Sequence, residues 1–113
     1  MRTKVLSVGG SIIAPNEPDT GFLLEFSQMV TEWLDANEDA RLILVAGGGG
    51  PARIYQNSYK KVAEGFSSIQ KKNASFADTD ALNYACDWLG IMATRLNAQI
   101  LKTVFGPLCP QDV

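Results

Sequence analysis

The sequence predicts an α/β fold with a mainly parallel sheet. Two short apolar runs each end in glycines, and a helical pattern follows each run along the chain. The second run, residues 41–46, shows no alternation of apolar and polar residues and is typical of a strand covered on both faces. Alternating strands and helices predict parallel strands, with ligand sites where strands end and helices begin.

The first strand is expected at Val5–Val8, where aliphatic and β-branched residues lead into the tight loop Gly9-Gly10-Ser11. Turn-forming residues occupy 15–19, and Asp19 or Thr20 is suited to cap the next helix. The apolar positions of that helix recur at helical spacing and are Phe22, Phe26, Met29, Val30 and Trp33. We therefore expect an amphipathic helix after the first strand.

The second strand runs directly into Gly47–Gly50, and Pro51 is expected to open the helix that follows. The core stripe expected for this helix is Tyr55, Tyr59, Val62, Ala63 and Phe66. Residues 67–77 are expected to form a polar surface connection. The pattern thus repeats the order of strand, glycine loop and helix.

A long third helix is expected after Asp78 or Thr79, either of which is suited to cap it. Gly106-Pro107 predicts its end, because glycine and proline terminate helices. Its expected core stripe is Leu82, Ala85, Leu89, Ala93, Leu96 and Ile100. Tyr84, Trp88 and Ile91 lie beside that stripe, so the helix is apolar on more than one side and predicts oligomer formation.

The composition excludes several function classes. The net charge of −2 offers no basic excess for binding nucleic acid. The sequence contains no histidine, which excludes a histidine base and a zinc site within this chain. No apolar run approaches the ~20 residues needed to cross a bilayer. The two cysteines form no CxxC pair, so we expect a cytoplasmic protein in a reducing environment.

The loop Gly47–Gly50 is the strongest candidate for a phosphate-binding site. Its four glycines expose backbone N–H groups to close approach, and the following helix adds its positive N-terminal end. Neither this loop nor Gly9-Gly10-Ser11 matches the P-loop or the dinucleotide-binding pattern. A tight turn without a ligand remains the alternative for both loops.

Arg53 favours the same interpretation. We expect this cation in the first turn of the second helix, where it opposes the helix dipole by typically ~0.3–1 kcal/mol. A bound phosphate would compensate for that opposition. The alternative is that Arg53 points into solvent or pairs with a carboxylate elsewhere.

The third helix carries a second, polar strip. Its members recur at helical spacing and are Asn83, Asp87, Gly90, Thr94 and Asn97. The Asp87 carboxylate could accept hydrogen bonds from ligand hydroxyls, with Gly90 permitting close approach. The alternative is an ordinary solvent-exposed strip.

Three motifs in order, KVLSVGGSII, LILVAGGGGPARIY and DWLGIMATRLNA, resemble those of the amino acid kinase family. Within that family they are most similar to the motifs of archaeal-type uridylate kinases, from about Lys4 to Leu101. The resemblance implies a three-layer α/β/α sandwich. It also implies transfer of the γ-phosphoryl group of ATP to a small acceptor, with Mg²⁺.

Carried over by position, the resemblance implies that Gly10, Ser11 and Gly49 bind ATP. Gly48 would face the phosphate of UMP, and Asp87 would hold UMP through its ribose hydroxyls. A Gly48→Val substitution is expected to block the phosphate with little effect on folding.

The resemblance also implies that Arg53 binds phosphate and that Arg53 and Ser11 contribute to catalysis. Bacterial relatives place a phosphate-binding lysine where this sequence has Ser7, so that role passes to Arg53 or to residues outside this chain. Relatives that act on isopentenyl phosphate use a histidine, which argues against that substrate here.

The family's chains continue into a second half that supplies the adenine site. We therefore expect residues 1–113 to form the N-terminal, UMP-binding part of one domain, with no second domain. The expected function is a uridylate kinase whose fragment is inactive alone. Expected partners are UMP, ATP, the missing C-terminal half and further copies in a dimer or hexamer.

Two other functions remain open. One is a non-catalytic module that binds nucleotide or phosphate or serves assembly. The other is a kinase that phosphorylates a carboxylate or carbamate in place of UMP.

Overall fold

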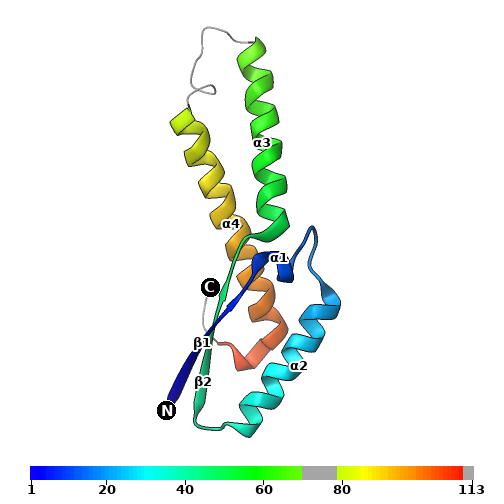
Figure 1. Cartoon of the computed structure of the whole chain (residues 1–113), viewed down its shortest axis with the longest axis vertical. Coiled ribbons are helices and arrows are strands. Elements are labelled where there is room, and N and C mark those ends of the chain that lie inside the picture. Colours follow the sequence, from blue (N-terminus) through cyan, green and yellow to red (C-terminus); the bar gives the residue numbers. More distant parts are fainter. Residues whose placement is uncertain (70–78, 111–113) are drawn as a thin grey trace.

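The computed structural model describes residues 1–69 and 79–110 (Figure 1). In these residues two strands and four α-helices follow the expected order of alternation. The elements are β1 (Arg2–Val8), α1 (Gly10–Ile13), α2 (Thr20–Ala36), β2 (Ala40–Ala46), α3 (Gly49–Ile69), α4 (Thr79–Phe105) and the 3-10 turn η2 (Gly106–Leu108). No helix in these residues is long and apolar enough to cross a membrane.

The two strands pair in parallel, which confirms the predicted α/β class. The register runs from Arg2 opposite Ala40 to Val8 opposite Ala46, and α2 forms the crossover between the strands. β1 begins at Arg2, earlier than the sequence predicts, because the whole of β1 is paired with β2. Both strands therefore end at the same edge of the sheet.

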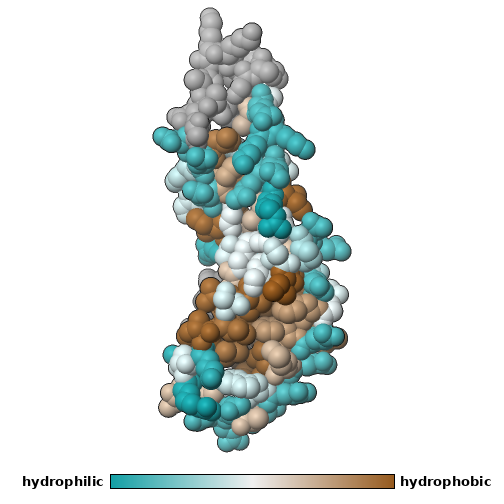
Figure 2. All heavy atoms as spheres, in the orientation of Figure 1, coloured by the Kyte–Doolittle hydropathy of each residue, from teal (hydrophilic) through white to brown (hydrophobic). Residues whose placement is uncertain are grey.

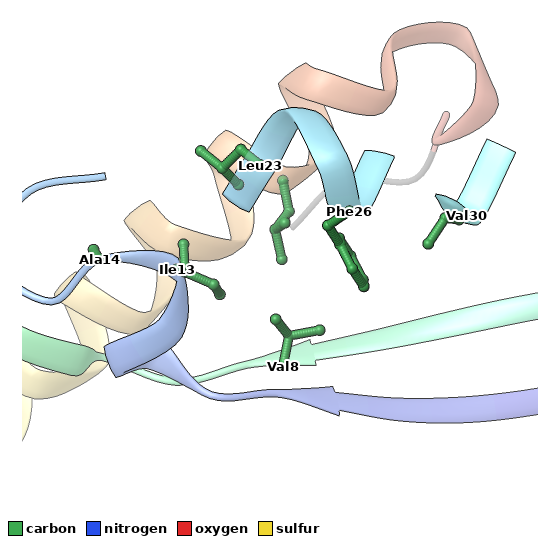
Figure 3. Packing of buried hydrophobic residues seen from close by; sticks show 7 residues of the cluster. Val8, Ile13, Ala14, Leu23, Phe26 and Val30 are labelled. Carbon is green, nitrogen blue, oxygen red and sulfur yellow. The ribbon is translucent and has the colours of Figure 1, made fainter. Parts of the chain in front are cut away.

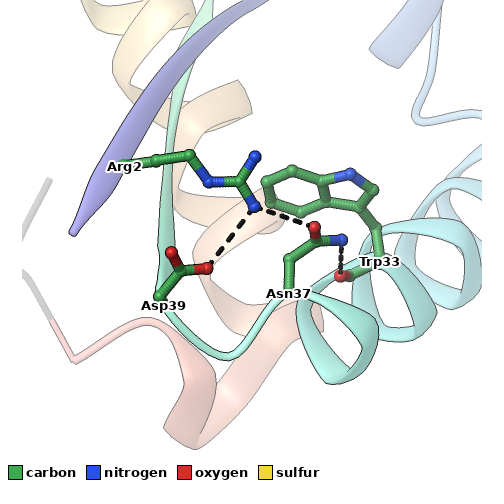
Figure 4. A network of polar contacts seen from close by, with 4 residues as sticks. All are labelled: Arg2, Trp33, Asn37 and Asp39. Carbon is green, nitrogen blue, oxygen red and sulfur yellow. Dashed lines mark hydrogen bonds and ion pairs between the residues drawn. The ribbon is translucent and has the colours of Figure 1, made fainter.

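A polar cluster fixes the start of β1 to the end of α2 (Figure 4). The Arg2 guanidinium donates to Asn37 Oδ1 at 3.0 Å and lies 3.4 Å from Asp39 Oδ1. The Asn37 side chain donates to the Trp33 carbonyl at 2.8 Å. Because the Arg2–Asp39 pair is exposed, its main effect is to fix geometry, and it adds little stability.

One face of the sheet carries the hydrophobic core (Figure 3). The buried residues of this cluster are Val8, Ile13, Ala14, Leu23, Phe26, Val30 and Leu101. Phe26 stacks on Phe22 at a centroid distance of 5.3 Å and meets Phe105 edge to face at 6.2 Å. The core thus joins β1, α1, α2 and the C-terminal part of α4.

Helix α2 begins as the sequence predicts, with Asp19 as its cap. The Asp19 carboxylate accepts a hydrogen bond from the Phe22 N–H at 3.0 Å. The expected stripe is wrong at Met29, which is 55% exposed. Leu23 contributes to the buried face instead, and Met29 lies on the flank of that face.

The opposite face of the sheet is exposed, so the expectation that β2 is covered on both faces is wrong for the described residues. Val5 is 67% exposed, and Ile43 and Val45 on β2 are 41% and 50% exposed. Figure 2 shows apolar side chains gathered in the lower half of the molecule, where the sheet lies.

Helices α3 and α4 extend beyond the sheet and pack against each other (Figure 1). The expected core stripe of α3 is wrong at Tyr55, Val62 and Phe66, which are exposed, whereas Ala63 is buried. On α4 the expected stripe is wrong at Leu96, which is 66% exposed. In the described residues each of these two helices has the other as its main partner, which covers only one side of it.

The helix ends also differ from the sequence pattern at two points. α3 begins at Gly49, two residues before Pro51, and continues to Ile69, so the connection expected from Ser67 starts later. The rest of that connection, with Asp78, lies outside the described residues. α4 ends at Phe105 as predicted, and Gly106 there has φ +58°.

The dimensions show that the chain is too extended for a complete compact domain. The radius of gyration is 18.5 Å, against ~13 Å expected for a compact chain of this length. The accessible surface is 7872 Å², against roughly 6,100 Å² for a compact monomer of this mass. Both values agree with an incomplete α/β domain.

Candidate functional site

The candidate site lies where β1 and β2 end and their two glycine loops meet. Because Val8 is opposite Ala46, the chain leaves both strands at the same level. A Cβ atom at Gly10 would overlap the backbone of Gly47 and Gly49. Glycine at position 10 therefore permits direct contact between the two loops, which the sequence predicted only as separate features.

Beyond the first loop the chain forms one short helical turn, α1, in place of the simple tight loop expected from Gly9-Gly10-Ser11. The Gly9 carbonyl accepts hydrogen bonds from Ile12 N–H at 3.0 Å and Ile13 N–H at 3.1 Å. Ile13 is fully buried and anchors this turn in the core, while Ser11 is exposed. The Ser11 side chain is thus accessible at the edge of the site.

The second loop is fixed to the first by its own backbone. Gly50 donates its N–H to the Ala14 carbonyl at 3.0 Å, and a Cβ atom at Gly50 would overlap the Pro15 carbonyl. Gly49 adopts φ +62°, which favours glycine. A Cβ atom at Gly49 would also overlap the Gly10 carbonyl. Packing thus requires glycine at positions 49 and 50 even without a ligand.

Gly48 faces helix α4. A Cβ atom at Gly48 would lie 2.8 Å from Ala52 Cβ and 3.2 Å from Thr94 Oγ1. The expectation that Gly48→Val leaves folding nearly unchanged is therefore wrong, because the valine side chain would collide with both neighbours. Phosphate binding by this loop therefore has to be tested by a substitution at another residue, because Gly48→Val would also disturb folding.

Asn97 on α4 forms hydrogen bonds to the backbone of the second loop. Its side-chain amide donates to the Gly47 carbonyl at 2.8 Å and to the Gly48 carbonyl at 3.0 Å, and Asn97 is only 3% exposed. Sequence reasoning placed Asn97 on a polar strip but did not find this role. The only signal in the sequence was that Asn97 follows Thr94 by one helical turn on that strip.

The polar strip on α4 therefore divides into two parts. Thr94 and Asn97 lie against the glycine loop, whereas Asn83 and Asp87 are exposed. Gly90 serves helix packing, because its free Cβ position lies 3.0 Å from the Gln56 side chain of α3. The expectation that Gly90 leaves room for a ligand is wrong, since Gln56 occupies that space and donates to the Cys86 carbonyl at 2.9 Å.

Arg53 is exposed on α3, one helical turn after Gly49. Because α3 begins at Gly49, Arg53 is its fifth residue, and the expectation of a first-turn position is wrong. Among the described residues no carboxylate pairs with Arg53, so the pairing alternative finds no support there. Its guanidinium is available to an anion next to the loop.

The structure brings some of the candidate residues together and leaves others apart. Gly10, Gly48 and Gly49 belong to one backbone cluster. Ser11 follows Gly10 in the chain, and Arg53 lies one helical turn after Gly49. No described contact joins the exposed Asp87 to that cluster. Within the described part of the chain, no group of three or more acidic or cysteine side chains could hold a metal ion.

Comparison with known proteins identifies the family. The amino acid kinase family matches residues 2–112 of the sequence. This chain belongs to the amino acid kinase family. The match confirms the resemblance carried by the three motifs, and the α/β fold with paired glycine loops agrees with it.

Curated members of the family extend this result. A uridylate kinase of Methanosarcina barkeri is 34% identical over 109 residues, which cover 95% of this chain and 37% of that protein. A uridylate kinase of Pyrococcus abyssi is 34% identical over 97 residues, 86% of this chain and 34% of that protein. One of Thermococcus onnurineus is 31% identical over 112 residues, 96% of this chain and 41% of that protein. The chain thus spans little more than a third of the length of these uridylate kinases.

The contact between the loops generates a stability prediction. Gly10→Ala places a methyl group in the backbone of the second loop and should lower the free energy of unfolding by at least ~2 kcal/mol. The control is Gly65→Ala on α3, where no atom lies within 4 Å of the added Cβ. That control should gain up to ~1 kcal/mol of helix propensity. Urea unfolding followed by circular dichroism measures both, and equal effects would contradict the loop contact.

Proposed function

We propose that this chain is the N-terminal, UMP-binding part of a uridylate kinase, which converts UMP and ATP to UDP and ADP. The names of the curated relatives support the reaction. The observation that carries the proposal is the direct contact between the two glycine loops. Two loops whose backbones touch would hold two phosphate groups side by side, as transfer between two nucleotides requires.

Each loop receives one substrate in this proposal. Gly10, Ser11 and Gly49 would contact the phosphates of ATP, and Gly48 would serve the phosphate of UMP. The support is their position in one backbone cluster at the ends of parallel strands, where α/β folds bind ligands. Asp87 would hold the ribose of UMP from α4, and its exposure leaves the carboxylate free to do so.

Catalysis would consist of positioning and electrostatic stabilisation. Arg53 would neutralise charge that develops on the transferred phosphoryl group, and the Ser11 hydroxyl would orient a phosphate oxygen. Mg²⁺, when bound, would supply positive charge that offsets the charge of the phosphate groups. No covalent intermediate and no side-chain base is needed, so the absence of histidine is compatible with this chemistry.

The proposal includes a requirement for more protein than this chain. The chain spans 34–41% of the length of the relatives compared above. The exposed face of the sheet, with Val5, Ile43 and Val45, and the unpaired outer edge of each strand would dock the C-terminal half. That half would supply the adenine site and further cationic groups.

The chain alone should therefore show no measurable kinase activity. The measurement is a coupled assay of ADP release with UMP as acceptor, on protein of verified intact mass 12.2 kDa. Activity that appears only with the C-terminal half would support the proposal. Turnover by the homogeneous short chain would contradict the need for a second half.

The acceptor is decided with a different preparation, the complete enzyme in place of the short chain. With the complete enzyme, UMP should be phosphorylated and glutamate or carbamate should not. Phosphorylation of a carboxylate or carbamate with UMP inert would overturn the uridylate assignment. Nucleotide binding without any transfer would favour the non-catalytic module.

For Asp87 the prediction concerns substrate selectivity. Asp87→Asn should weaken UMP binding by ~1.5–3 kcal/mol and leave ATP binding nearly unchanged, because a charged hydrogen-bond acceptor of the ribose is lost. Glu64→Gln, on the exposed surface of α3, makes the same chemical change outside the site. Calorimetric titration with each nucleotide is the measurement. An equal loss of affinity for UMP and ATP would contradict the placement of Asp87 at the UMP site.

Self-association is the remaining part of the proposal. On α4, Tyr84, Trp88 and Ile91 are 66%, 45% and 44% exposed, and Tyr84 meets Trp88 edge to face at 6.3 Å. Because large apolar side chains on a helix favour burial, this face would pair subunits into a dimer, or a hexamer built from dimers.

Sedimentation at micromolar concentration should therefore show a species larger than a monomer. Trp88→Glu should weaken association at least tenfold, because it places a charge in the apolar face. The control Gln99→Glu adds the same charge on an exposed position of α4 and should leave association unchanged. A stable monomer throughout the micromolar range would remove this part of the proposal.

A further inference from the structure

Among the described residues, Asn97 is the one polar residue that is buried. Its Nδ2 atom lies 2.8 Å from the Gly47 carbonyl oxygen and 3.0 Å from the Gly48 carbonyl oxygen. An asparagine amide carries two N–H groups, so this pair of carbonyls uses both. Burial makes these hydrogen bonds costly to lose, because no water replaces them.

These two hydrogen bonds fix the direction of the neighbouring N–H groups. In a trans peptide the N–H points opposite to the C=O of the same peptide unit, and the described chain contains no cis peptide. The carbonyls of Gly47 and Gly48 are directed toward α4. The N–H groups of Gly48 and Gly49 are therefore directed away from α4.

A loop of four glycines needs such a restraint. Glycine loses more conformational freedom on folding than any other residue, and an unrestrained loop would present its N–H groups in many directions. The Gly48 carbonyl has one further contact, from Ala52 N–H at 3.4 Å, which is long for a hydrogen bond. Asn97 is thus the side chain that bonds to both of these peptides, in addition to the backbone contact with Gly10.

We propose that Asn97 is a positioning residue, which orients the Gly48 and Gly49 N–H groups so that they bind phosphate groups. This inference rests on the proposed function, in which Gly48 serves the phosphate of UMP and Gly49 those of ATP. Asn97 itself does not touch the ligand and acts through the two peptides. The rival explanation is that Asn97 only stabilises the packing of the loop on α4.

The first experiment needs neither a ligand nor a variant. Nuclear magnetic resonance of the labelled chain should show couplings through the hydrogen bonds from Asn97 Nδ2 to the carbonyl carbons of Gly47 and Gly48. The side-chain amide of Gln99, exposed on the same helix, should show no such coupling to the loop. Absence of both Asn97 couplings would overturn the proposal.

The second experiment uses Asn97→Asp, which keeps the shape of the side chain but replaces a double donor by an acceptor. The control is Gln99→Glu, the same chemical change on the exposed side of α4. In Asn97→Asp the ¹⁵N heteronuclear NOE of the Gly48 and Gly49 amides should fall, with that of Val5 in the sheet unchanged. UMP and inorganic phosphate should bind about tenfold more weakly, and the control should stay within twofold.

The outcomes separate this proposal from the proposed function. If the ¹⁵N heteronuclear NOE of the Gly48 and Gly49 amides is unchanged in folded Asn97→Asp, the positioning role is overturned, whether or not UMP binds. A lower melting temperature with unchanged UMP affinity would show that Asn97 is only structural. If the NOE of these amides falls as expected in Asn97→Asp but the unsubstituted chain binds no UMP, Asn97 restrains the loop and the proposed function is overturned. If Asn97→Asp does not fold, Asn97→Ser, which keeps one donor, replaces it in the same measurements.

Discussion

The peptide groups of Gly10 and of residues 47–49 lie in direct contact, and the rest of the site depends on this contact. It follows from the sheet register, because Val8 opposite Ala46 brings both strands to the same edge at the same level. No side chain longer than hydrogen fits between the loops. The contact therefore sets the distance between the two candidate phosphate positions and leaves little freedom to vary it.

Helix α4 supports this contact from the opposite side. Thr94 and Asn97 pack under the second loop, and Leu101, one helical turn later, enters the hydrophobic core. One helix thus connects the loop to the core that positions β1 and α2. The arrangement agrees with a site that is ordered before ligands bind, which is the condition for catalysis by positioning.

The apolar surfaces outside the core lie in two places. The exposed face of the sheet is the one on which the proposed function docks the C-terminal half, and the chain spans about a third of the length of the relatives compared above. The exposed face of α4 lies on the helix pair that extends beyond the sheet. Both surfaces add to an accessible area that is large for the mass of the chain.

The sequence by itself determined the order of the two strands and the three longer helices, the end of α4 and the family, because these depend on local patterns and on motif spacing. It narrowed the cap of α2 to Asp19 or Thr20, and the structure shows Asp19. It did not determine which apolar residues are buried. Met29, Tyr55 and Leu96 fit a helical stripe, yet whether a stripe is covered depends on which elements pack against it. Only the tertiary structure decided that Gln56 fills the space at Gly90 and that Asn97 holds the glycine loop, because these contacts join residues 30 to 50 positions apart.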